Sequence, residues 1–536
     1  MGEKVNDSKS EPGIKSLIDK LNLEIDTNGD PKSTVADAGQ LDMLSQAPSP
    51  EALLLVPEEA ARKYSLIPLS VEANTLKVAM ADPDDVLAIS ALAALTKKRI
   101  KPIPATAKDI QSAIDFNYKA FGDISKQFGL TTAKPEAPEE DRAAADMADD
   151  SEVARMLSTL VNEGVKSRAS DIHIEPEADK VTVRYRIDGI LHNITTLPPG
   201  IQGNLISRIK ILSGMNIADR LRPQDGQFSV RAKGRDIDIR VATISTVHGE
   251  MAVLRLLDKT MAVMLLSQLG FLPESQKKFE QILKIPYGMI LVSGPTGSGK
   301  TTTLYAVVNS LDKVGRNIIT TEDPVEYRFS GINQVQINPR AGLTFATALR
   351  SIVRLDPDVI LVGEIRDAET AEIAIQSALT GHLVLSSVHA NDTVGVLFRL
   401  LDLGIEPFMI TSAVIGIVAQ RMVRRVCPKC AQTRRAPAME QIAYLKEMAE
   451  ERSEFSYGAG CKACSNTGYL GRTGVFEILP ITDEIRRLLA NRAGITEIKS
   501  RALKEGMITL AKDGMTKAKA GITTPYEVLR NVYSVA

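Results

Sequence analysis

Eight consecutive residues of this 536-residue chain have the types and the spacing of a phosphate-binding loop. Residues 294–301 read Gly-Pro-Thr-Gly-Ser-Gly-Lys-Thr, a complete G-x-x-x-x-G-K-S/T motif. The glycines allow backbone N–H groups to turn inward around an anion, and the lysine is expected to reach the β- and γ-phosphates of ATP. The expected nucleotide contacts are Gly294, Pro295, Thr296, Gly297, Ser298, Gly299, Lys300, Thr301 and Thr302, with the Thr301 hydroxyl as a ligand of Mg²⁺.

The residues on either side of the motif favour this interpretation over an ordinary glycine-rich turn. Residues 288–293 read Gly-Met-Ile-Leu-Val-Ser, as a buried strand should, and residues 301–311 are predicted to form a helix. The start of that helix adds its positive dipole end to the anion site. A strand, a glycine-rich loop and a helix in this order are what nucleotide binding requires.

Two groups of carboxylates downstream of the loop are candidates for the hydrolytic step. Residues 318–326 read Ile-Ile-Thr-Thr-Glu-Asp-Pro-Val-Glu, a strand that ends in Glu322, Asp323 and Glu326. A second buried strand, residues 359–362, delivers Glu364 at its carboxyl end. Ligands of such sheets bind at the carboxyl ends of strands, so both groups are expected to converge on the nucleotide. The alternative is that these carboxylates are solvated loop residues.

The second group departs from the common Walker B pattern. Gly363 stands where an aspartate usually precedes the catalytic glutamate. Magnesium is therefore expected to be held mainly by Thr301, by water and by the first acidic group. The departure also leaves open a nucleotide-gated scaffold that binds ATP without useful hydrolysis.

All four cysteines of the chain lie between residues 427 and 464, as two C-x-x-C pairs. Four thiolates on two tight turns suit tetrahedral zinc with no open coordination position, which is a structural site. The predicted zinc ligands are Cys427, Cys430, Cys461 and Cys464. Two redox dithiols or plain buried cysteines are the alternative, and helix is expected within the intervening residues 436–449.

The overall composition is that of a globular protein with sizeable cores. The chain is 44% hydrophobic and 24% charged, with a net charge of −1. This balance and an aromatic content of 4% argue against a helicase or DNA translocase, which would need a basic surface with stacking aromatics. No apolar run reaches the roughly 18 residues that span a bilayer, and no secretory signal opens the chain, so a cytoplasmic location is expected.

Changes in composition divide the chain into five parts, and the predicted class is α/β. The expected parts are a flexible arm over residues 1–50, a small α/β domain over 51–120, an acidic linker over 121–150, a second α/β domain over 151–270 and the nucleotide-binding domain over 271–536, which includes the 427–464 insertion.

Several long motifs then occur in one order. The phosphate loop is followed by Thr-Thr-Glu-Asp-Pro-Val-Glu, then by Arg-Leu-Asp-Pro-Asp-Val-Ile-Leu-Val-Gly-Glu-Ile-Arg-Asp, then by Leu-Thr-Gly-His-Leu-Val-Leu-Ser-Ser-Val-His-Ala-Asn-Asp, and finally by the two cysteine pairs. In this the chain resembles the GspE/PilB group of type II secretion and type IV pilus assembly ATPases, through most of residues 151–536 and more weakly through 51–120.

The resemblance implies a RecA-like ATPase domain that closes into hexameric rings, preceded by two smaller domains of which the second is PAS-like. It implies that Glu364 is the general base, that Glu322, Asp323 and Glu326 form an acidic box, and that His382 and His389 form a histidine box near the γ-phosphate. It further implies that Arg240 and Arg255, from residues 151–270, neutralise charge on the bound nucleotide during hydrolysis. Packing histidines and surface ion pairs are the simpler alternatives for these side chains.

The resemblance also implies partners. In relatives, the domain matched by residues 51–120 docks onto platform proteins of the inner membrane, so membrane contact is expected only through partners. A spacer without a binding role is the alternative for this domain. The extension and secretion members carry the tetracysteine element and the retraction members lack it, which argues against a retraction motor. A motor for pilin or pseudopilin assembly is therefore expected, with type IV pilus and type II secretion both open.

Overall fold

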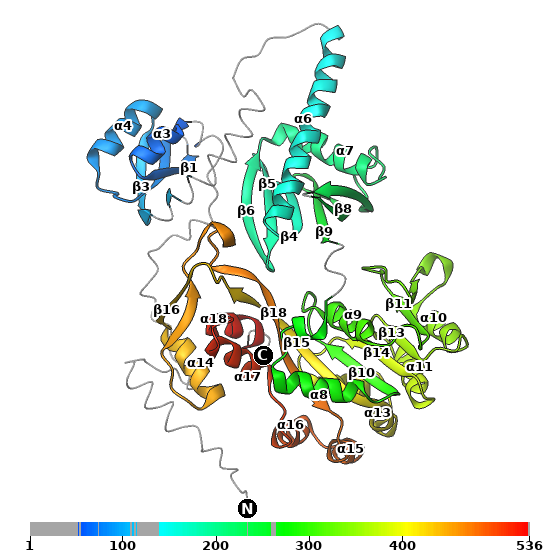
Figure 1. The fold of residues 1–536 in the computed structure, drawn as a ribbon. Helices are drawn as coiled ribbons and strands as arrows, with labels where there is room; N and C mark the ends of the chain where they lie inside the picture. The colour runs from blue at the N-terminus through cyan, green and yellow to red at the C-terminus, as the bar shows by residue number, and fades with distance from the viewer. Residues whose placement is uncertain are drawn as a thin grey trace, which may run out of the picture. The chain divides into compact units, whose positions relative to one another are not determined.

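The computed structural model describes residues 52–533 apart from 53–54, 73, 108–109, 112–113, 115–138, 233 and 259–263, and for 139–151 it describes the backbone alone. These residues form two compact units, one up to residue 258 and one from residue 264 onwards (Figure 1). The expected arm over residues 1–50 lies outside the described residues. The second unit begins before the expected boundary at residue 271, because Leu269 is buried in its core.

The first unit contains a small three-stranded sheet, with helices beside it. Its elements are α3 (Glu58–Lys63), β1 (Leu66–Glu72), β2 (Thr75–Met80), α4 (Val86–Thr96) and β3 (Arg99–Pro104). The strands are ordered β1-β2-β3, with β1 and β2 antiparallel and β2 and β3 parallel. Asp85 starts α4 as its N-cap, by accepting hydrogen bonds from the backbone N–H groups of Leu87 and Ala88.

A six-stranded antiparallel sheet makes up the rest of this unit. Its elements are α6 (Glu139–Lys166), β4 (Ala169–Pro176), β5 (Val181–Ile187), β6 (Ile190–Leu197), α7 (Gln202–Leu212), β7 (Gln224–Ala232), β8 (Arg235–Thr246) and β9 (Gly249–Asp258). The strands are ordered β6-β5-β4-β9-β8-β7, and alternate residues such as Ile172 and Ile239 form the core beneath the helices. Residues 139–150, expected to be linker, form the first part of α6, because their alanines, glutamates and arginine have good helix propensity despite the missing apolar period.

The second unit is built on a seven-stranded sheet. Its strands are β10 (Gly288–Ser293), β11 (Ile318–Glu322), β12 (Asn333–Gln336), β13 (Val359–Val362), β14 (Leu383–Val388), β15 (Val414–Val426) and β18 (Tyr469–Pro480). They are ordered β12-β11-β13-β14-β10-β15-β18, and all pairs are parallel except β15 with β18. Six aligned strands therefore end at the same edge of the sheet.

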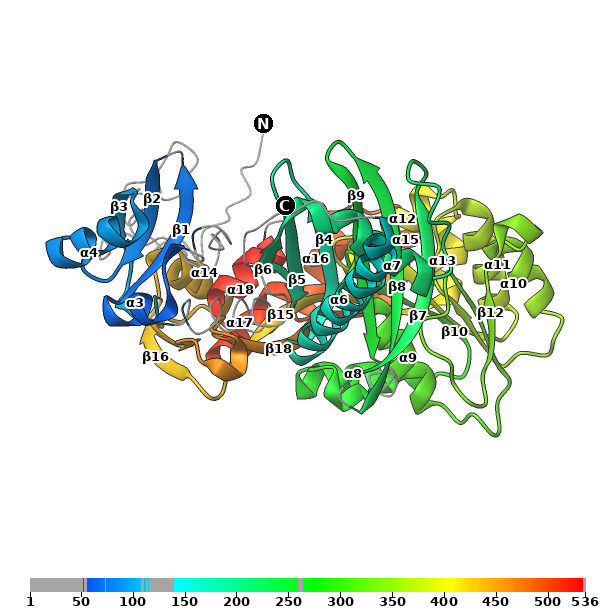
Figure 2. The same cartoon turned by 90° about the horizontal axis from the view of Figure 1, so that it is seen from above.

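Helices cover both faces of this sheet. The helices are α8 (Pro273–Leu283), α9 (Lys300–Ser310), α10 (Phe345–Ile352), α11 (Ala368–Leu379), α12 (Thr393–Asp402), α13 (Pro407–Ala413), α15 (Asp483–Ala490) and α16 (Ile495–Lys504). Ile290 and Val292 of β10 face α8 and α9, whereas Met289 and Leu291 face the core shared with α10 to α13. Figure 2 shows α8 and α9 on one side of β10 and α11 to α13 on the other. The α/β prediction is confirmed.

The insertion after β15 is more regular than expected. Besides α14 (Ala438–Met448), it contains a two-stranded antiparallel sheet of β16 (Ala431–Arg435) and β17 (Glu454–Gly458). Its small core, with Tyr444 and Phe455, is shared with α17 (Leu510–Lys519) and α18 (Pro525–Val528). Among the described residues, no helix combines the length and apolarity needed to cross a membrane.

A buried ion pair within α17 ties this helix to β18. Asp513 and Lys517 are both essentially inaccessible, and the Lys517 ammonium also donates to the carbonyl oxygen of Gly474 at 2.7 Å. Burial raises the pKa of Asp513 to about 6. Because this pKa lies above the value of an exposed aspartate, the ionised carboxylate costs stability at higher pH. That cost decreases as the pH falls below the folded-state pKa, and it is gone below the pKa of the unfolded chain.

We expect Lys517→Met to lower the free energy of unfolding by about 3–5 kcal/mol near pH 8, because Asp513 is then buried as an unpaired charge. The loss should shrink at pH 5, and Asp513→Asn together with Lys517→Met should recover most of it. Thermal unfolding of the full chain at both pH values measures these differences. An equal loss at both pH values would contradict the role given to the Asp513 charge.

Candidate nucleotide-binding and metal sites

The predicted phosphate loop joins the end of β10 to the start of α9. Gly297 and Gly299 have φ values of 78° and 87°, in the region that favours glycine, and Gly299 precedes the first residue of α9. A Cβ atom at Gly294 would lie 2.4 Å from the carbonyl oxygen of Gln420. The two outer glycines therefore serve different needs, since Gly294 permits close contact with β15 and Gly299 permits the turn into the helix.

Lys300 lies folded against this loop. Its ammonium donates to the carbonyl oxygens of Gly294 at 2.8 Å and Pro295 at 3.1 Å. Burial lowers the pKa of Lys300, while the negative charge of Glu364 acts in the opposite direction. Lys300 and Glu364, predicted from separate motifs, are thus close enough to interact electrostatically.

A residue that the sequence analysis did not single out holds the loop in place. Gln420 is fully buried on β15; its amide nitrogen donates to the carbonyl oxygen of Ser298, and its amide oxygen accepts from the Thr303 hydroxyl at 2.7 Å. The signal available in the sequence was the polar pair Gln420-Arg421 directly after the apolar run of residues 414–419. A buried polar pair inside a strand requires partners, and here they lie on the phosphate loop and around it.

Glu364 follows β13 at the same edge of the sheet. Its carboxylate is mostly buried; one oxygen accepts from Arg366, and the other lies 3.7 Å from Nε2 of His389. Partial burial and the charge of Lys300 lower the pKa of His389, which favours the neutral imidazole. The Gly363 departure has a packing reason, because a Cβ there would lie 3.2 Å from the backbone oxygen of Thr321.

The three carboxylates of the first acidic group differ in how far they are exposed to solvent. Glu322 is buried at the end of β11, on the same face as Thr320, and its carboxylate accepts from the side chains of Tyr305, Thr320 and Gln334. Strand alternation thus turns the Glu322 side chain into the core, and its contact with the nucleotide stays a prediction. Asp323 is exposed, and its charge acts on Arg366, so it lies near the Glu364 segment. Glu326 is partly exposed, and its backbone N–H donates to the Tyr305 hydroxyl.

The two predicted histidines lie at opposite ends of β14. His389 directly follows the strand, beside Glu364, whereas His382 precedes it and pairs its carbonyl oxygen with the N–H of Gly288, at the start of β10. The His382 ring contacts the carbonyl oxygen of Ser377 at the end of α11, at 2.9 Å. The length of β14 separates His382 from the phosphate loop of this chain, so its predicted place in a histidine box near the γ-phosphate stays a prediction.

Arg240 and Arg255 are directly opposite each other on β8 and β9. Like charges at such positions repel, and Asp171 compensates by accepting from Nε of Arg255 at 3.0 Å. The structure thus brings together two arginines that were predicted from motifs fifteen residues apart. They belong to the first unit, so their role at the nucleotide stays a prediction.

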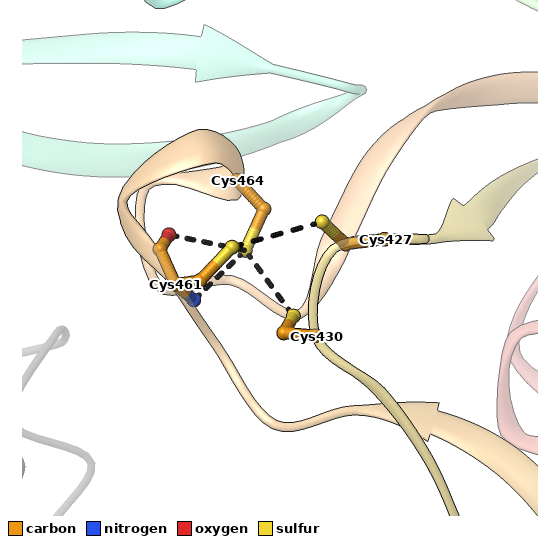
Figure 3. Close-up of side chains that lie close together, drawn as sticks. All are labelled: Cys427, Cys430, Cys461 and Cys464. Carbon is orange, nitrogen blue, oxygen red and sulfur yellow. Dashed lines mark hydrogen bonds between the residues drawn. The ribbon is translucent and has the colours of Figure 1, made fainter.

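The four cysteines converge where β15 ends and β18 begins. Their sulfur atoms all lie within 4.8 Å of one another, and Figure 3 shows the side chains of the two pairs pointing toward a common centre. The Sγ–Sγ distances are 3.8 Å between Cys427 and Cys461, 3.9 Å between Cys430 and Cys464, and 3.7 Å between Cys461 and Cys464. Tetrahedral zinc with Zn–S bonds of about 2.3 Å requires sulfur separations of about 3.8 Å, so the geometry fits the metal.

The shifted pKa values of the clustered cysteines also favour a metal site. A backbone N–H of Cys464 lowers the pKa of Cys461 to about 7, whereas burial and the neighbouring thiols raise the pKa of Cys430 to about 12. Four thiolates this close repel one another unless a cation lies between them. The four cysteines are therefore suited to binding a divalent metal, whereas four ionised thiolates without a metal would destabilise one another.

Comparisons with known proteins give the family. The family described as "Type II/IV secretion system protein" matches residues 146–530, and the one described as "MshEN domain" matches residues 39–122. The "Type IV pilus assembly ATPase PilB" of Thermus thermophilus is 42% identical over 90% of this chain and 55% of its own length. The "Type II secretion system protein E" of Xanthomonas campestris is 44% identical over 88% of this chain and 83% of its own length.

A solved structure supports the fold alone. The ATPase DotB of Legionella pneumophila is 20% identical, with a TM-score of 0.54 over 71% of this chain and 96% of that chain.

The chain spans only about half of the Thermus relative, and most of the Xanthomonas relative. Since the first family match extends over more than half of the residues, this chain belongs to the type II/IV secretion system protein family.

Proposed function

We propose that this protein hydrolyses ATP as a hexameric motor that powers assembly of pilin or pseudopilin subunits. The observation that carries the proposal is the meeting of Lys300, Glu364 and His389 at one edge of the sheet, next to a complete phosphate loop. The two relatives whose printed names are a pilus assembly ATPase and a type II secretion protein support the same function. The motor is proposed to work at the cytoplasmic face of the inner membrane, through platform proteins and without nucleic acid.

Each residue at this edge has a distinct proposed task. Lys300 and the loop N–H groups bind the β- and γ-phosphates. Arg366 holds one oxygen of Glu364, and the other oxygen, facing His389, accepts the proton of the attacking water. His389, favoured as a neutral imidazole, orients that water or the γ-phosphate. Mg²⁺, bound by Thr301 and the phosphates, would supply charge neutralisation on the β- and γ-oxygens.

Arg240 and Arg255 are proposed to neutralise charge that develops on the phosphates. Their adjacent positions on β8 and β9 place two permanent cations side by side, and the planar guanidinium fits phosphate oxygens. A site completed by residues of another domain can convert hydrolysis into domain movement.

The cysteine cluster is proposed to bind one structural zinc ion. All four donors are protein thiolates, so no coordination position is left for a substrate. Bound metal would fasten the two-stranded sheet of β16 and β17 to the ends of β15 and β18.

We expect Glu364→Gln to lower kcat for ATP hydrolysis by about 10²–10⁴-fold, because the variant cannot accept a proton from water. Affinity for ATP should be kept, whereas Lys300→Ala should lose affinity through its missing phosphate contact. Phosphate release and the binding of a fluorescent ATP analogue measure the two effects. Lys284→Ala, an exposed lysine at the end of α8, is the control for Lys300→Ala. Undiminished hydrolysis by Glu364→Gln would contradict its assignment as general base.

The same Glu364→Gln change in the native host separates the two machines. Loss of surface pili with normal protein secretion would assign a pilus-extension motor, and the reverse would assign a secretion motor. Loss of neither, with the purified variant inactive, would contradict both assignments.

Arg240→Ala and Arg255→Ala should each lower kcat more than they weaken ATP binding, because the charge they neutralise grows during hydrolysis. Removal of one donor that stabilises charge in the transition state typically lowers kcat by about 10²–10³-fold. Arg231→Ala, an exposed arginine on β7 of the same sheet, is the control and should leave kcat unchanged. Full activity in both variants would exclude the proposed role.

Freshly purified protein should contain one zinc ion per chain by elemental analysis. A chelator or Cys461→Ser should release it and lower the thermal stability of the C-terminal part of the chain, because the metal links elements that otherwise share only a small core. Lys462→Ala, next to Cys461 but without a thiol, should retain the metal. Protein free of zinc and equally stable in the Cys461→Ser form would refute a structural metal site.

A further inference from the structure

A buried arginine lies between the phosphate loop and the segment that carries His389. Arg421, on β15, is 4% exposed. One of its terminal nitrogens donates to the carbonyl oxygen of Gln420 at 3.1 Å, and the other donates to that of Asn391 at 2.8 Å. In the part of the chain that the structure describes, no carboxylate lies within ion-pair distance of Arg421. Its permanent charge is therefore balanced only by carbonyl dipoles and by more distant acids.

The Gln420 carbonyl that Arg421 contacts is part of the phosphate-loop support. It is the oxygen against which Gly294 packs, at a distance that leaves no room for a Cβ. The side chain of the same Gln420 holds Ser298 and Thr303. Arg421 is thus joined on one side to the structure that shapes the phosphate loop.

On its other side, Arg421 holds residues 389–393, here called the 389–393 segment. The Ser293 hydroxyl donates to the carbonyl oxygen of Ala390 at 2.7 Å, and Lys499 of α16 donates to Asp392 at 2.9 Å. The carboxylate of Glu477, on β18, accepts from the backbone and hydroxyl of Thr393 at 3.0 and 2.6 Å. These anchors surround the segment, and Arg421 supplies its link to β15 at Asn391, two residues from His389.

We propose that Arg421 is a positioning residue that fixes the 389–393 segment against the phosphate loop, so that His389 keeps its place beside Glu364 during hydrolysis. Two carbonyl oxygens on separate segments are bridged by one planar guanidinium, and only a rigid, forked donor spans both at once. The proximity of this charge to Lys300, whose pKa it helps to lower, indicates that Arg421 belongs to the nucleotide edge of the sheet. The inference rests on the proposed ATPase function.

Fold stabilisation alone is the simpler role for a buried arginine, but it accounts poorly for this one. A guanidinium buried without a carboxylate partner costs free energy, and it places a second cation near Lys300. Such an arrangement suits an edge where the polyanionic phosphates of ATP bind. A role in holding His389 explains both contacts of the side chain.

The test is a double-mutant cycle between Arg421→Gln and His389→Ala in the full chain. We expect Arg421→Gln to lower kcat by about 10²-fold while KM changes little, as a misplaced catalytic group does. The double variant should be no slower than the slower single variant, because both changes disable the same group. Arg399→Ala, an exposed arginine on α12 beyond the segment, should match the unchanged protein.

Additive effects on kcat, or an equal rise in KM, would overturn the proposal. Hydrogen exchange provides a readout that does not depend on hydrolysis. Arg421→Gln should speed amide exchange in the 389–393 segment and leave β10 protected, and unchanged exchange in the segment would also overturn the proposal. If the unchanged protein releases no phosphate from ATP, the proposed function fails, while the exchange result still decides whether Arg421 holds the segment.

Discussion

The parallel alignment of β11, β13, β14 and β10 is the constraint on which the rest of the second unit depends. Parallel strands in register end together, so every residue that directly follows one of them reaches the same edge. The phosphate loop follows β10, Glu364 follows β13 and His389 follows β14. By the same rule His382, which precedes β14 by one residue, lies at the opposite edge of the sheet. The site is therefore a consequence of strand order and direction.

Placing several cationic side chains at one edge of the sheet costs free energy through their mutual repulsion, and a nearby carboxylate reduces this cost. Lys300 and Arg421 lie near each other, and the pKa values of Lys300 and His389 are lowered by burial and by neighbouring cations. Glu364, paired with Arg366, is the nearby negative charge that acts on both. The cations Lys300 and Arg421 at this edge would attract an anion, which agrees with the proposed binding of ATP there.

Strand β15 joins the two proposed sites. Its buried Gln420 and Arg421 support the phosphate loop and the 389–393 segment, and Cys427 directly follows its last residue. Its antiparallel partner β18 contributes Glu477 to that segment and begins shortly after the second cysteine pair. A metal that fixes the ends of these two strands would also limit how far Gln420 and Arg421 can move, so the zinc site and the nucleotide edge share one mechanical element.

The sequence by itself determined the phosphate loop, the cysteine pairs, the α/β class and the bounds of strands such as residues 288–293 and 359–362, because these depend on local residue types and periodicity. Only the tertiary structure decided that Glu322 turns into the core, that Arg240 faces Arg255, that the cysteine insertion contains a two-stranded antiparallel sheet, and that Gln420 and Arg421 serve the loop. Those outcomes depend on which strands become neighbours and on the face each side chain takes. Neighbours are set by contacts between residues far apart in the chain, which a local pattern does not contain.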